Sequence, residues 1–94
     1  MMSKIDADFY KTLEAELKTL LQDIRGLKDA QVEEIARYLN AGEYGLTLGT
    51  VCLALNANGL TVNRKTYQRI EALLQKMEMD MGYCAGIKVE NSGA

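Results

Sequence analysis

Apolar side chains recur at steps of three and four along the first quarter of the chain. They begin at Phe9 and end at Ile24, and most positions between them are polar. Because an α-helix turns once every 3.6 residues, this spacing places the apolar side chains on one face of an amphipathic helix. The pattern therefore predicts a first helix over residues 6–24, with Gly26 just beyond its end.

A second amphipathic segment covers residues 30–39. Asp29 precedes it as a candidate N-cap, and Gly42 follows where a helix can close through a left-handed backbone conformation. We therefore expect a second helix between these two residues. Its apolar face comprises Val32, Ile35, Ala36 and Leu39.

The run from Tyr44 to Asn56 has no charged side chain and is apolar nearly all round. A helix of this kind is stable when neighbouring elements cover it, so we expect it to be the central helix of the fold. Leu48, Val51, Cys52 and Leu55 are predicted to face inward, with Leu46 and Leu53 widening the apolar surface.

Residues 56–59, Asn-Ala-Asn-Gly, predict a turn because asparagine and glycine tolerate left-handed backbone conformations. A calcium loop starting at Asn56 would need a glutamate at its twelfth position, which is Tyr67 here, so a capping turn is the better interpretation. A fourth helix is expected to begin between residues 61 and 63 and to end between Met79 and Met81. Its inward side chains are Tyr67, Ile70, Leu73, Leu74 and Met77.

These elements predict one all-α domain over residues 1–94, a compact bundle of about four antiparallel helices. Short loops favour packing between consecutive helices. The core is expected over residues 6–81, followed by a partly flexible tail over 82–94 whose last few residues are mobile. The chain contains no proline, which suits helices joined by glycine and asparagine.

The composition offers few residues of the types that catalyse reactions. The chain has no histidine, and its serines, Ser3 and Ser92, lie near the ends. Cys52 and Cys84 lie far apart in sequence and are expected to be free thiols. We therefore predict a protein that is not an enzyme and needs neither a cofactor nor a metal. With no apolar leader-like segment and no run long enough to span a bilayer, it is expected in the cytoplasm.

Charge is distributed unevenly along the chain. Residues 1–34 carry five basic and eight acidic side chains, a net charge of −3, whereas residues 35–76 carry five basic and two acidic, a net charge of +3. Two interpretations remain open at this point. The acidic residues of the first two helices either form a patch that attracts a cationic partner or only keep the domain in solution.

The junction between the second and third helices is the most distinctive stretch. Gly42 and Gly45 bracket Glu43 and Tyr44, and Gly45 lets the third helix begin close to a neighbour. Tyr44 is either a staple packed on the core or an exposed anchor for a partner, and we favour the anchor. Together with the acidic edge of the second helix, the predicted partner-binding residues are Asp29, Glu33, Glu34, Arg37, Glu43 and Tyr44.

A resemblance rests on residues 40–48, Asn-Ala-Gly-Glu-Tyr-Gly-Leu-Thr-Leu, on residues 51–53, Val-Cys-Leu, with Leu55 and, after the turn, on Tyr67, Ile70, Leu73 and Leu74. Over residues 28–80 the chain resembles the small helical immunity proteins of bacterial polymorphic toxin systems, in particular the MafI-type family. Gly49 departs from the family pattern, which usually has an acidic residue there.

The resemblance implies a non-catalytic protein that binds and neutralises a cognate toxin nuclease domain, in related systems an EndoU-type RNase. It implies a monomer when free and a heterodimer with the toxin, with no membrane or nucleic-acid partner. Two alternatives come from other classes of protein. One is a small helical DNA-binding or transcription-regulating module. The other is a dimerisation module that uses Met77, Met79 and Met81.

Overall fold

The computed structural model describes residues 4–90, and the predicted all-α class is confirmed in this part of the chain. Five helices and two very short strands make up the described residues. In chain order they are α1 (Lys4–Asp23), α2 (Asp29–Asn40), α3 (Tyr44–Ala57), β1 (Thr61–Val62), α4 (Arg64–Lys76), α5 (Gly82–Ala85) and β2 (Lys88–Val89).

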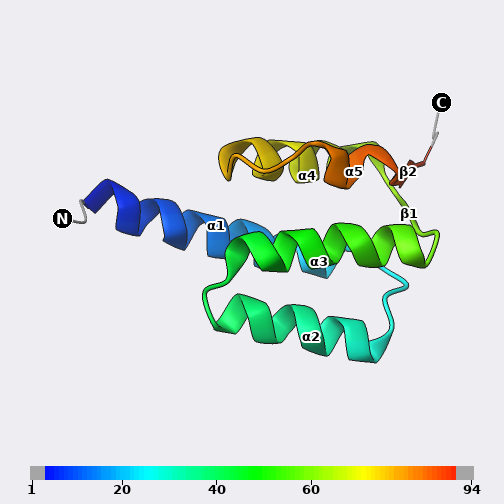
Figure 1. Cartoon of the computed structure of the whole chain (residues 1–94), viewed down its shortest axis with the longest axis horizontal. Helices are drawn as coiled ribbons and strands as arrows, with labels where there is room; N and C mark the ends of the chain where they lie inside the picture. The colour runs from blue at the N-terminus through cyan, green and yellow to red at the C-terminus, as the bar shows by residue number, and fades with distance from the viewer. Residues whose placement is uncertain (1–3, 91–94) are drawn as a thin grey trace.

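The apolar helix α3 lies at the centre, as its lack of charge predicts. Figure 1 shows α3 between α2 on one side and the α4–α5 segment on the other. The inward side chains expected on α3 are all fully buried, which is the burial that an uncharged helix requires. They are Leu48, Val51, Cys52 and Leu55.

α2 packs against α3, α1 packs against both α3 and α4, and the short α5 also contacts α3 and α4. The expected arrangement of consecutive antiparallel neighbours therefore describes α2 and α3, whereas α1 packs against helices further along the chain. Fully buried leucines at positions 13, 17 and 20 of α1 face this packing, in agreement with the apolar face predicted for the first helix.

The helix ends differ from the predicted ones by a few residues, for local reasons. Asp29 was expected to cap α2, but it is the first helical residue: the cap is Lys28, whose N–H donates to the Gln31 side chain at 3.0 Å. At the start of α4, the Asn63 side chain accepts the Thr66 N–H at 2.7 Å. α4 ends at Lys76 rather than at residues 79–81, because Glu78 adopts a left-handed conformation with φ 54°.

The segment after residue 81 contributes to the fold more than its sequence predicts. α5 is followed by β2, which pairs in parallel with β1, and the Glu90 N–H donates to the Val62 carbonyl at 2.6 Å. Cys84 and Ile87 are buried, so the core extends beyond residue 81. A helix of four residues and a strand of two are too short to show periodicity. The expected mobility of the last few residues concerns 91–94, which lie outside the described residues.

Removal of the Ile87 side chain tests whether this segment is part of the core. We expect Ile87→Ala to lower the free energy of unfolding by about 2–4 kcal/mol, because the substitution leaves a cavity beside buried neighbours. The exposed neighbour provides the control: Lys88→Ala should change stability by less than about 0.5 kcal/mol. Urea unfolding followed by circular dichroism measures both, and equal stabilities would contradict the assignment.

Candidate functional site

Three of the six predicted partner-binding residues form one exposed stripe on α2. Asp29, Glu33 and Arg37 follow one another at steps of four, so they lie above one another on the same helix face. All three are exposed. We call these residues the α2 stripe; its first two turns are acidic and its third is basic.

Glu34, the neighbour of Glu33, points in a different direction. It is half-buried and lines a groove between α2 and α3, where its carboxylate accepts a long hydrogen bond of 3.5 Å from the Tyr38 hydroxyl. The groove has a volume of about 330 Å³. Its lining residues are Gln31 and Glu34 from α2, and Thr50, Leu53, Ala54 and Ala57 from α3.

Backbone hydrogen bonds fix the junction between α2 and α3. Gly42 has φ 78°, as predicted, and its N–H donates to the Leu39 carbonyl while the Glu43 N–H donates to the Tyr38 carbonyl. These two bonds form a Schellman motif, which ends α2 and reverses the chain. Glu43 therefore sits exposed at the start of α3, and its carbonyl accepts the Thr47 hydroxyl at 2.7 Å.

Tyr44 combines features of the two alternatives that its sequence position allows. Its ring is half-buried against the core and lies 6.1 Å, centroid to centroid, from the ring of Tyr10. Its hydroxyl donates to the Glu14 carboxylate at 3.2 Å. Partial burial, together with the negative charge of Glu14, raises the pKa of Tyr44 above its ordinary value. Tyr44 thus faces α1 and fastens the start of α3 to it.

The six residues consequently do not form one cluster. The α2 stripe faces solvent, Glu34 faces the groove, and Tyr44 faces α1. Asp29 and Glu43 lie at opposite ends of α2, whose length is roughly 18 Å for twelve residues at 1.5 Å each. A partner that touched both of them would have to cover the whole length of α2.

Most acidic side chains of α1 have partners within the protein, so the negative surface is smaller than the charge count predicts. Glu16 forms an ion pair of 2.7 Å with Lys76, and Asp23 pairs with Arg69. Both pairs join α1 to α4. The Glu14 carboxylate lies 3.6 Å from the Lys18 Nζ atom, and it also accepts the hydrogen bond from the Tyr44 hydroxyl. The uneven charge along the chain is therefore used in part to hold the negative first helix against the positive fourth one.

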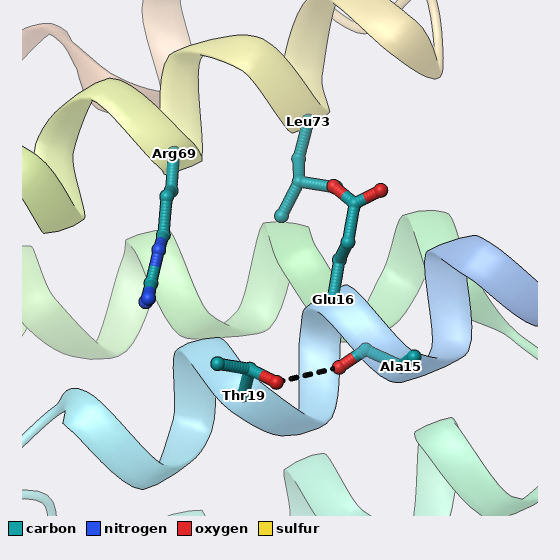
Figure 2. Close-up of a pocket in the computed structure, with 5 residues that line it drawn as sticks. All are labelled: Ala15, Glu16, Thr19, Arg69 and Leu73. Atoms are coloured by element: carbon teal, nitrogen blue, oxygen red, sulfur yellow. Dashed lines mark hydrogen bonds between the residues drawn. The ribbon is translucent and has the colours of Figure 1, made fainter.

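A shallow pocket of about 220 Å³ lies between these two ion pairs. Figure 2 shows Arg69 and Leu73 reaching from α4 toward Ala15, Glu16 and Thr19 of α1. Both charged side chains of the pocket are already paired, and the Thr19 hydroxyl donates to the Ala15 carbonyl at 3.0 Å. The pocket therefore offers no free acid, base or nucleophile for chemistry.

The methionines considered for dimerisation do not form an exposed stripe. Met77, Met79 and Met81 follow α4 in the chain and are half-buried against the core. Met79 and Tyr83 cover Gly49 of α3: a Cβ built on Gly49 would lie 3.5 Å from the Tyr83 ring and 3.9 Å from the methyl carbon of Met79. Because Gly49 is buried under these two side chains, an acidic side chain is unsuited to position 49.

Both cysteines are free and buried. Burial, with a smaller effect of the nearby Cys84, raises the pKa of the Cys52 thiol to about 12. The Cys84 thiol donates to the Met81 carbonyl at 3.2 Å and accepts the Tyr67 hydroxyl at 3.6 Å. Because a thiolate is the reactive form of cysteine, the raised pKa lowers the reactivity of Cys52 at neutral pH.

The partner-binding prediction overlooked the exposed apolar side of α3. Leu53 is 61% exposed and Leu46 is 50% exposed, the largest exposed fractions among the large apolar side chains of the described residues. Their separation by seven residues, two helical turns, is a signal present in the sequence. The sequence pattern assigned Leu46 and Leu53 only to a widening of the apolar surface of this helix, without a role in binding.

Comparison of the chain with protein-family models, with curated proteins and with solved structures finds no match. Among residues 4–90, no helix is both long enough and apolar enough to cross a membrane. The surface of α2 and α3 is therefore the main basis for a functional proposal.

Position 49 offers a direct test of the packing beside this surface. We expect Gly49→Ala to be neutral or to stabilise the protein by up to about 1 kcal/mol, because alanine is the better helix former and its Cβ makes only ordinary contacts. Gly49→Glu should cost at least about 3 kcal/mol, since its charge would be buried without a partner. Thermal and urea unfolding measure both variants, and a stable Gly49→Glu variant would contradict the described packing.

The contact between Tyr44 and Glu14 predicts a dependence of stability on pH. The folded state holds the Tyr44 proton more tightly than the unfolded state does, so this stabilisation is complete below pH about 10 and is lost as pH rises further. Glu14→Gln should reduce the loss, and Tyr44→Phe should abolish the contribution of this residue. Spectroscopic titration of tyrosinate formation, with urea unfolding at several alkaline pH values, measures both effects. An unaltered titration in Glu14→Gln would rule out the contact.

Proposed function

We propose that this protein is a cytoplasmic immunity protein that binds and neutralises the nuclease domain of a cognate bacterial toxin, with no catalysis of its own. The observation that carries the proposal is the exposed acidic part of the α2 stripe, Asp29 and Glu33, with Glu43 exposed beyond the end of the same helix. The resemblance of the α2–α3 junction to MafI-type immunity proteins supplies the class of partner.

Electrostatics supports this pairing. A nuclease binds the phosphates of its substrate through lysine and arginine side chains, so its substrate groove is positively charged. The acidic residues of α2 can occupy such a groove in competition with nucleic acid, and they raise the rate of association with a cationic surface. The basic side chains Arg69 and Lys76 do not oppose this approach, because they pair with α1.

A DNA-binding module is the second candidate, and one observation favours it. Arg64 and Lys65 are both exposed at the start of α4, where they are free to contact phosphates. A helix that reads bases also presents polar or basic side chains to the groove, whereas the exposed side of α3 carries Leu46 and Leu53. Measurement of DNA binding at several salt concentrations separates the two candidates, since the proposed immunity protein has no affinity for DNA at moderate salt.

Co-expression tests the proposed function. The toxin to test is a nuclease domain at the C-terminus of a secreted protein, sought first in the gene immediately upstream. Wild-type protein should restore the growth of cells that express this domain and should abolish its nuclease activity in vitro. Glu33→Lys and Glu43→Lys should each raise the dissociation constant about tenfold or more, because each places a positive charge against a positive surface.

The matched control is Glu90→Lys, which makes the same change of charge at an exposed position next to β2. It should leave the affinity within about threefold of wild type, and circular dichroism should show that all variants are folded. Failure of the wild-type protein to bind or to protect would refute the proposed function. Equal affinities for all three variants would refute the assigned surface alone.

A further inference from the structure

The exposed side of α3 is one narrow stripe. Seven of its fourteen residues are buried, and they occupy every direction around the helix except one. The remaining direction contains Leu46, Thr50, Leu53 and Ala57, which follow one another at steps of three and four. We call these four residues the α3 stripe. It extends over three turns, about 16 Å, and contains no charge.

Solvent alone does not account for this composition. The exposed side of a helix at the surface of a protein is normally polar, as it is on α4 at Gln68 and Gln75. Single exposed leucines are common, but here two of them share one side of a helix and three of the four stripe residues line a groove. An apolar stripe along a groove is the arrangement in which helices dock onto proteins.

Glu34, on the α2 side of the groove, determines which charge a complementary ligand must carry. Glu34 faces the groove, and its long hydrogen bond with Tyr38 leaves its carboxylate free to accept a stronger one. Gln31 lies beside it, but its side-chain oxygen already accepts from Asn58 at 2.7 Å. The groove therefore joins an apolar floor on α3 to a negative wall on α2, and a complementary ligand is apolar on one side and positively charged at the edge.

A second copy of the chain does not supply such a ligand among its described residues. On α4 the exposed basic residues of such a copy are Arg64, Lys65 and Lys76, and the exposed positions between them are Gln68, Ala72 and Gln75, none of which is a large apolar residue. The other large exposed apolar side chains are Tyr10, Val32 and Tyr83, which lie on three different helices. Among the residues whose exposure is described, no helix other than α3 presents two large exposed apolar side chains, so none supplies the apolar stripe of such a ligand.

We propose that the groove between α2 and α3 binds an amphipathic helix of a partner protein, with apolar side chains seven residues apart on the α3 stripe and a lysine or arginine against Glu34. The partner helix lies along the groove between α2 and α3, where a third helix packs side chains between those of two neighbours. This surface is distinct from the α2 stripe, and the proposal goes beyond the proposed function, because it holds for a partner of any activity.

Two synthetic helical peptides test the proposal. Each is labelled with a fluorophore and is about three turns longer than the α3 stripe. Both carry leucines seven residues apart; one has lysines beside them and the other has glutamates at the same positions. Fluorescence anisotropy should show binding of the lysine peptide by the wild-type protein and no binding of the glutamate peptide. Leu53→Lys should weaken binding at least tenfold, and Glu34→Gln several-fold with a smaller dependence on salt.

Val32→Lys is the matched control, because Val32 is also an exposed apolar residue, at 47%, and is not part of the groove. It should bind the lysine peptide within about twofold of wild type. The proposal would be overturned by any of three results: no binding of the lysine peptide, equal binding of the two peptides, or an unchanged affinity in Leu53→Lys. Sedimentation should show a monomeric wild-type protein, and a dimer that Leu53→Lys dissociates would overturn it in favour of a second copy. No toxin enters these measurements, so their outcome is separate from the test of the proposed function.

Discussion

The fold depends on the burial of α3. A helix of fourteen residues without a charged side chain is not stable in water by itself, so the other elements must cover it. α2 covers one side, α1 another, and α5 with the preceding connection a third. Gly45 and Gly49 allow that last approach, because Met79 and Tyr83 lie against positions where larger side chains would stand. The α3 stripe is the part of this apolar helix that residues 4–90 leave uncovered.

Surface ion pairs between α1 and α4 also hold this arrangement of helices. The ion pairs of Glu16 with Lys76 and of Asp23 with Arg69 lie on the surface, where single pairs contribute little to stability. Their more important effect is on the distribution of charge, since they neutralise Glu16 and Asp23 of α1, whereas Asp29, Glu33 and Glu43 are exposed and form no ion pair among the described residues. Net charge along the sequence therefore overstates the negative surface of α1.

Periodicity predicted the four long helices and the central place of α3, because each has an apolar pattern several turns long. It did not predict α5 and β2, whose positions come from contacts of Cys84 and Ile87 with the core rather than from local pattern. Periodicity also could not predict the direction in which single side chains point. Glu33 and Glu34 are adjacent in sequence, yet one faces solvent and the other the groove, because neighbouring helical positions differ by about 100° and the place of α3 decides which is covered.

Glu34 is the residue at which the two surfaces of α2 meet. Exposed acids such as Glu33 act over a distance comparable to the Debye length, about 8 Å in physiological salt, and so affect mainly how fast a cationic partner arrives. The apolar contacts of Leu53 act only at contact, and so affect mainly how long a bound partner stays. A carboxylate at the edge of an apolar groove does both, because water is partly excluded from it once the groove is filled. In the two proposals made above, the residues that speed the arrival of a partner and those that slow its release lie on one helix pair, α2 and α3, which is what neutralisation of a toxic enzyme would require.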